Sequence, residues 1–135
     1  MTITVAVLGR FLMSLIFFVS GWRKLDDPGA VAQSLIRATA SASWVPDAVA
    51  TGIRDAAPVL VWTAILFELV GAFCLATGLK KEFGAQLLIA FLVPVTLLFH
   101  PPGDPGQLMS FLKNVALMGG LLLVASSPAE PIRDR

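Results

Sequence analysis

The sequence has a single cysteine, Cys74, and this scarcity removes several kinds of site at once. One thiol cannot form an internal disulfide, a paired redox motif or a metal site built from several cysteines. The chain also lacks a glycine-rich phosphate-binding loop and the His-Glu-x-x-His pattern of zinc peptidases. No motif therefore indicates a nucleotide or a metal.

Charged residues are scarce as well. They make up 14% of the chain, whereas soluble domains carry about 25%. The net charge is +1 at pH 7, so there is no strongly basic surface and nucleic acid is not an expected partner. Hydrophobic residues account for 56% of the chain and the mean hydropathy is +0.81. This composition predicts an integral membrane protein surrounded by a lipid bilayer.

Long apolar runs are what the sequence does contain. The run at 58–79 is long enough to cross a hydrocarbon core of about 30 Å. It carries one carboxylate, Glu68, near its middle. A bare carboxylate is costly inside a bilayer, so Glu68 is expected to face protein, water or a cation.

Three further apolar runs complete four predicted spans. They lie at 3–22, 83–99 and 107–125. The predicted fold is an all-α transmembrane four-helix bundle, with short interfacial helices between the first and second spans. It forms a single domain over residues 1–127, and residues 128–135 are a polar C-terminal tail. The first run is not interpreted as a signal peptide, because its only early cation, Arg10, lies inside the run.

The connection between the first two spans is long for a compact bundle and contains two helix-start signals. Asp27 followed by Pro28 is typical of an N-cap and a first helical position. A second start follows Trp44 and reaches Asp47. We expect two short helices on the membrane surface, with Asp55 capping the second span.

An even number of spans places both termini on one side of the membrane. The distribution of lysine and arginine does not separate the two sides, because four cations fall on each. Those on the side of the termini are Lys80, Lys81, Arg133 and Arg135, and those opposite are Arg23, Lys24, Arg37 and Arg54. Because Lys80 and Lys81 lie in the shortest loop, we expect cytoplasmic termini.

Three of the four predicted spans carry an ionisable residue, namely Arg10, Glu68 and Lys113. At about 1.5 Å per residue, Glu68 lies roughly 15 Å from the side of the termini, and each cation falls within about 5 Å of that depth. We therefore expect Glu68 to pair with both cations. Two interpretations stay open: a structural ion network that fixes the helix register, and a charged binding pocket.

Three other residues are candidates for such a pocket. Lys24 and His100 fall on the same side as Lys113, so the mouth is expected there, beneath the long first connection. Asn114 fits a helix–helix hydrogen bond and a pocket donor equally well. His100 is interpreted as an interface residue, with a proton relay or a ligand contact as the alternative. It has no cysteine or carboxylate at ligand spacing, so no metal site is predicted.

Several short motifs occur in order along the predicted spans. They are Gly9-Arg10, Ser20-Gly21-Trp22-Arg23-Lys24-Leu25, Glu68-Leu69-Val70-Gly71, His100, Phe111-Leu112-Lys113-Asn114 and Gly119-Gly120. Together they resemble the DoxX family of small bacterial four-span membrane proteins, over about residues 7–125. The family name comes from a subunit associated with thiosulfate:quinone oxidoreduction. The resemblance implies a location in the bacterial inner membrane and a link to redox or oxidative-stress systems.

Our first functional interpretation is a membrane protein that is not an enzyme on its own. Its polar interior binds a small amphiphilic or quinone-like molecule, or it serves as a membrane subunit of a redox-linked complex. The expected partners are a second copy of the chain or a membrane or peripheral redox protein. The candidate binding residues are Arg10, Lys24, Glu68, His100, Lys113 and Asn114.

Arg10 and Lys113 would bind an anion or a carbonyl, with Glu68 as their counter-charge. No catalytic residue is predicted, and no cofactor is expected apart from a quinone-like or lipid-like ligand. Two alternatives stay open. One is a component of a thiosulfate:quinone-type oxidoreductase in which Glu68 or His100 passes protons. The other is a carrier for a small anion.

Overall fold

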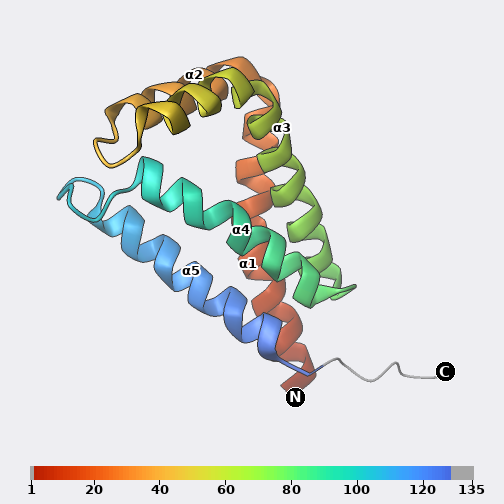
Figure 1. The fold of residues 1–135 in the computed structure, drawn as a ribbon. Coiled ribbons are helices and arrows are strands. Elements are labelled where there is room, and N and C mark those ends of the chain that lie inside the picture. The colour runs from red at the N-terminus through yellow and green to blue at the C-terminus, as the bar shows by residue number, and fades with distance from the viewer. Residues whose placement is uncertain (1, 129–135) are drawn as a thin grey trace.

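The computed structural model describes residues 2–128, and these residues form five α-helices and no strand. The helices are α1 (Thr2–Asp26), α2 (Pro28–Ser41), α3 (Asp47–Thr77), α4 (Lys81–Phe99) and α5 (Leu108–Ser126) (Figure 1). All except α2 are long and apolar enough to cross a membrane. The all-helical prediction is confirmed, and each predicted span overlaps one of the four long helices. The predicted tail at 128–135 lies, apart from Pro128, outside the described residues.

Helix α2 begins where the sequence predicts. The side chain of Asp27 accepts a hydrogen bond from the amide of Ala30 at 2.8 Å, and Pro28 occupies the first helical position. This cap satisfies a backbone N–H group that the first turn of a helix leaves without a partner. The turn from α1 into α2 is therefore ordered by its own local sequence.

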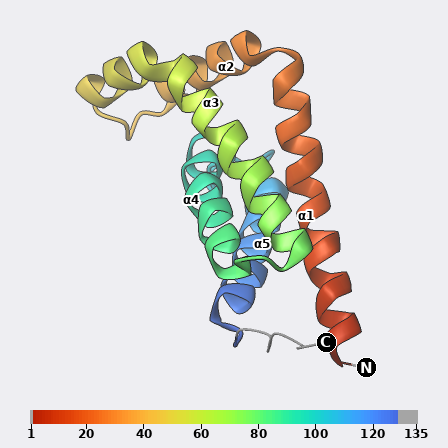
Figure 2. The same cartoon turned by 90° about the vertical axis from the view of Figure 1, so that its right-hand side faces the viewer.

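The second predicted interfacial helix is not a separate element. Residues 47–57 form the first part of α3, so Asp55 lies within that helix and does not cap a span. Pro58 follows inside the same helix and removes the backbone hydrogen bond to the carbonyl of Arg54. An internal proline can bend a helix without ending it. Accordingly, α3 starts beside α2 and then turns away from it (Figure 2).

Glycines bring α3 and α4 into backbone contact. A Cβ atom added to Gly84 would lie 2.6 Å from Cβ of Cys74 and 2.9 Å from the carbonyl oxygen of Gly71. A Cβ added to Gly71 would lie 2.7 Å from Cγ of Leu88. Helix α3 also packs along α1, and α5 packs mainly on α4. Side chains from all four long helices meet in one apolar cluster that includes Phe17, Leu75, Leu88 and Leu121.

Candidate functional site

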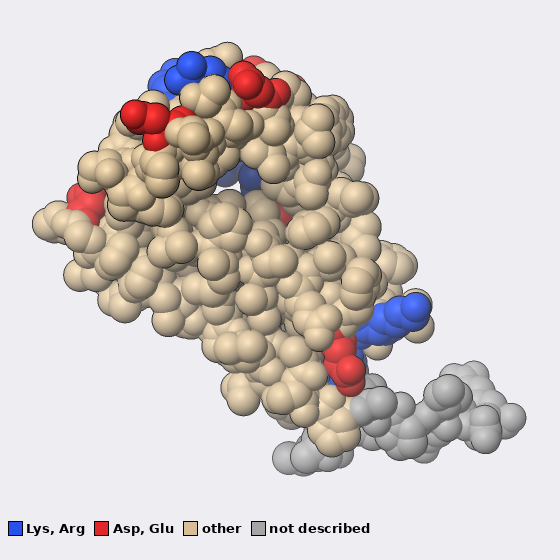
Figure 3. Space-filling view, in the orientation of Figure 1, with Lys and Arg blue, Asp and Glu red and all other residues tan. Residues whose placement is uncertain are grey.

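A pocket of about 700 Å³ lies among the five helices. Its wall is mostly apolar. Its polar and charged lining residues are Ser20, Lys24, Ser34, Glu68, His100, Gln107, Lys113 and Asn114. Figure 3 shows a hollow between two parts of the molecule: α2 with the first part of α3 on one side, and the remaining helices on the other. Charged atoms are visible inside this hollow. Five of the six predicted binding residues therefore line one pocket, and Arg10 does not.

Helix α2 forms part of the pocket wall. It contributes Ala30, Val31, Ser34 and Leu35. The first connection thus borders the pocket, on the side where the sequence places the mouth.

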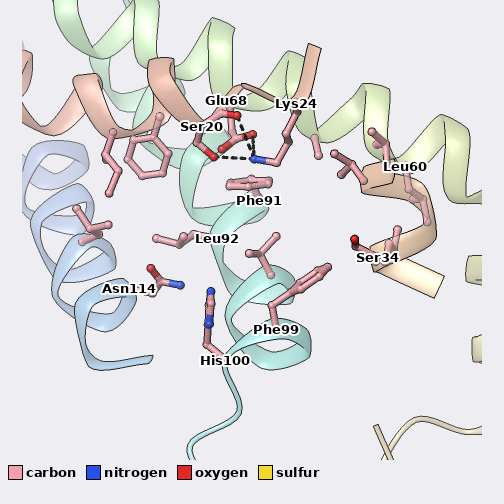
Figure 4. A pocket seen from close by; sticks show the side chains of 18 of the residues that line it. Ser20, Lys24, Ser34, Leu60, Glu68, Phe91, Leu92, Phe99, His100 and Asn114 are labelled. Carbon is pink, nitrogen blue, oxygen red and sulfur yellow. Dashed lines mark hydrogen bonds and ion pairs between the residues drawn. The ribbon is translucent and has the colours of Figure 1, made fainter. Parts of the chain in front are cut away.

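An ion pair occupies one end of the pocket (Figure 4). The carboxylate of Glu68 is completely buried, and Nζ of Lys24 donates to its Oε2 at 2.7 Å. The same Nζ donates to Oγ of Ser20 at 2.6 Å and lies 3.5 Å from the Ser20 carbonyl oxygen. It also lies 5.2 Å from the centre of the Phe91 ring, within the range of a cation–π contact. An ammonium has three protons, so the protein itself supplies acceptors for all of them.

The ion pair of Glu68 with Lys24 corrects the expected pairing with Arg10 and Lys113. Gly21 lies beside Glu68: a Cβ on Gly21 would be 3.3 Å from Cβ of Glu68. Arg10 lies eleven residues earlier on α1, which is about 16 Å along the helix. The expected pairing requires that the first span begins at the level in the membrane where the antiparallel second span ends. In the structure, α1 packs against α3 with a different offset along the helix axes, so Lys24 and not Arg10 lies beside Glu68.

Arg10 lies at the opposite end of the α1–α3 contact. Its side chain is 6% exposed, and its Nη2 is 3.1 Å from the position that a Cβ on Gly78 would take. Gly78 follows α3 in a left-handed conformation, with φ of 77°. A cation at the C-terminal end of a helix interacts favourably with the helix dipole. The guanidinium of Arg10, a residue of α1, therefore lies beside the turn between α3 and α4 and away from Glu68.

Asn114 connects α5 to α4. Its Nδ2 donates to Oγ1 of Thr96 at 3.1 Å, and that hydroxyl donates to the carbonyl oxygen of Leu92 at 2.6 Å. Both Asn114 and Thr96 are buried. Asn114 thus makes a helix–helix hydrogen bond, one of the two roles open from the sequence, while it also lines the pocket.

His100 lies at the end of α4 and contacts the loop before α5. Its Nδ1 is 2.7 Å from Oε1 of Gln107, and because an amide oxygen only accepts, the imidazole is the donor. Figure 4 shows His100 and Asn114 on one side of Phe91 and Leu92, with Glu68 and Lys24 on the other. The pocket therefore has two polar ends separated by an apolar middle.

Lys113 is the other cation in the pocket wall. Its side chain is exposed and, among residues 2–128, it makes no hydrogen bond or ion pair. It lies six residues into α5, a helix apolar enough to cross a membrane. An ionised side chain in such a helix is costly without a partner, so Lys113 offers a binding position for an acceptor or an anion.

Two residues of the ion-pair end, Ser20 and Phe91, are not predicted from the sequence. Ser20 accepts a hydrogen bond from Lys24, and Phe91 places its ring under the same ammonium. The spacing of Ser20 and Lys24, four residues apart on a helix, could have indicated the first contact. No sequence signal distinguishes Phe91 from the other phenylalanines.

Within the described part of the chain, no group of three or more histidine, cysteine or acidic side chains could hold a metal ion. A family model described as DoxX matches residues 5–101, which is more than half of the chain and includes most of α1 and all of α2, α3 and α4. The residues from 102 onward, including Lys113 and Asn114, lie beyond the matched region. Comparison with curated proteins gives no match, and comparison with solved structures gives none either.

Proposed function

The chain belongs to the DoxX family, and from this membership and the pocket we propose that it is a multi-pass membrane protein that binds a small amphiphile. We further propose that its four long helices form a transmembrane bundle in the bacterial inner membrane, with cytoplasmic termini and with α2 on the membrane surface. A redox protein or a second copy as partner is proposed on the family resemblance alone.

The observation that carries the proposal is the combination of an apolar wall with a few polar groups at two ends. Phe91, Leu92, Val95 and Phe99 supply an apolar stretch from α4. Pockets of this kind bury the body of a ligand against hydrophobic side chains and orient it through a few hydrogen bonds. A quinone-like or lipid-like molecule has this distribution of polar and apolar atoms.

Lys113 is the residue we assign to the acceptor or anionic group of the ligand. Its ammonium has no partner among the described residues, whereas the ammonium of Lys24 is already surrounded by acceptors. A ligand carbonyl, carboxylate or phosphate would therefore be bound at Lys113. The same contact would offset the cost of a cation on a membrane-spanning helix.

The test is native mass spectrometry of the protein released directly from membranes. We expect a bound small molecule on the wild-type chain and at least about tenfold lower occupancy on Lys113→Met, because a hydrogen bond to a charged group is lost. The matched control is Lys80→Met, since Lys80 is exposed and lies outside the pocket wall. A wild-type chain with no bound molecule, or equal occupancy on Lys113→Met, would contradict the proposal.

A further inference from the structure

One oxygen of Glu68 has no hydrogen-bond donor. Oε2 accepts from Lys24, but Oε1 is buried and makes no hydrogen bond within residues 2–128. A carboxylate that is paired with an ammonium is an acceptor at both oxygens. Leaving a charged acceptor buried and unpaired is costly, and Glu68 belongs to the pocket wall.

Lys24 has no proton left for Oε1. The protons of Lys24 are directed at Oε2 of Glu68 and at two oxygens of Ser20. The Ser20 hydroxyl accepts from Lys24 and is close enough to the carboxylate to interact with it, but Oε1 itself has no hydrogen-bond partner among the described residues. Phe91, on the other side of the ammonium, has no polar hydrogen to offer. Because Glu68 lines the pocket, a ligand bound there is a further source of a donor for this end.

We propose that the ligand carries a hydroxyl group that donates its proton to Oε1 of Glu68. The inference rests on the proposed function and names the chemistry of the ligand at the Glu68 end. An ether, a ketone or an anion has no proton to give and would place an acceptor against an acceptor, which disfavours binding. The ligand class is therefore a hydroxylated amphiphile, either a phenol or an aliphatic alcohol.

The first experiment compares two probes that differ only in the donor. Protein in nanodiscs is titrated with 4-nonylphenol and with 4-nonylanisole, and occupancy is measured by native mass spectrometry. We expect the phenol to bind at least about tenfold more tightly, because the methyl ether cannot donate to the carboxylate. A long-chain alkanol and its methyl ether form a second pair, which distinguishes an aromatic from an aliphatic alcohol as the source of the hydroxyl.

The second experiment reverses the polarity of the site. In Glu68→Gln the amide oxygen is needed as the acceptor for Lys24, so the amide nitrogen faces the Oε1 position as a donor. A phenol and an ether can both accept from it, and we expect the affinity ratio to fall to about one. The matched control is Glu82→Gln, because Glu82 is exposed in the first turn of α4 and outside the pocket wall. That variant should keep the wild-type ratio.

A third measurement needs no variant and covers the case in which Glu68→Gln does not fold. Infrared difference spectra of the wild-type protein should show a shift of a carboxylate stretching band on adding the phenol and none on adding the ether. Absence of that shift would overturn the inference.

The outcomes separate the two proposals. Equal binding of the phenol and its ether overturns the hydroxyl inference, leaves Ser20 as the donor to Glu68, and leaves the proposed binding function standing. A tenfold preference that persists in Glu68→Gln also overturns it, because the hydroxyl then donates elsewhere. If neither probe binds and membranes yield no bound molecule, the proposed function itself fails.

Discussion

At the scale of single residues, the burial of Glu68 makes the stability of the protein depend on Lys24. The carboxylate is fully buried, while Lys24 is 21% exposed. Breaking one half of a buried ion pair leaves an uncompensated charge, whereas replacing both halves with apolar side chains is often close to neutral. If the pair has a structural role, the single substitution should therefore destabilise the protein much more than the double substitution. If its role is purely functional, neither should change stability much.

Lys24→Met should lower the free energy of unfolding by about 3 kcal/mol, because Glu68 remains buried without a counter-charge. The double variant Lys24→Met/Glu68→Leu should recover most of this loss. Thermal unfolding in detergent, followed by circular dichroism, measures both. Arg23→Met is the control, since Arg23 is the exposed neighbour of Lys24 and lies outside the pocket wall. Equal losses in Lys24→Met and Arg23→Met would show that the ion pair contributes little.

The hydrogen bond between Asn114 and Thr96 gives a second prediction at this scale. A double-mutant cycle with Asn114→Ala and Thr96→Val should yield a coupling energy of about 0.6 kcal/mol, the usual size for polar contacts between membrane helices. Unfolding in detergent measures the coupling, and ligand occupancy of Thr96→Val should stay within about twofold of wild type. No measurable coupling would mean that Asn114 does not connect α4 and α5 in the folded protein.

At the scale of helices, the positions of α3 and α4 depend on the absence of side chains at their crossing. Gly71 and Gly84 face each other, and a Cβ added to either would lie 3.0 Å or less from the carbonyl oxygen of the other. Membrane helices gain no hydrophobic advantage over lipid by associating, so close packing through small residues contributes much of their attraction. Both helices carry pocket residues, including Glu68 and Phe91, and the crossing therefore fixes one side of the pocket.

Gly84→Ala should destabilise the protein by about 1–3 kcal/mol, because the added methyl group would overlap the Gly71 carbonyl and force the helices apart. Gly119→Ala is the matched control, since nothing lies within 4 Å of a Cβ at that position of α5. Alanine is the better helix former, so this control should be neutral or slightly stabilising. A stability scan in detergent compares the two. A neutral Gly84→Ala would rule out the close crossing.

At the scale of the whole molecule, the arrangement of loops defines two faces. The loop between α4 and α5 lies near the loop between α2 and α3, whereas the turn between α3 and α4 lies at the other end of the four long helices (Figure 1). This separation follows from antiparallel neighbours joined by short connections. Any ligand that reaches the pocket past α2 approaches from the face that carries the two loops.

Cysteine labelling tests this arrangement and the orientation together. In a Cys74→Ala background, an impermeant thiol reagent applied to spheroplasts should label Ser43→Cys and Gly103→Cys but not Lys80→Cys, since the proposed orientation, with cytoplasmic termini, would place the Lys80 turn inside. Labelling of Lys80→Cys alone would show that the protein has the opposite orientation in the membrane, with the same fold. Labelling of Ser43→Cys without Gly103→Cys would contradict the fold.

Local sequence was sufficient for part of the fold and of the candidate site. The start of α2 follows from Asp27 and Pro28, because a cap acts within one turn. The positions of His100 and Lys113 along their predicted spans were sufficient to place both on the same side of the membrane, and both line the pocket. The continuity of α3 could not be predicted, because whether Pro58 bends or ends a helix depends on what packs around it.

The sequence by itself determined that four long helices are apolar enough to cross a membrane and that one of them carries an acid in need of a partner. Both follow from composition and spacing along one segment. Only the tertiary structure decided that Lys24 is that partner and that Arg10 lies at the far end of the contact. The physical reason is the offset between α1 and α3, which is set by the close approach of Gly21 to Glu68. Hydropathy is nearly unchanged when one apolar helix slides along another, so it does not encode this offset.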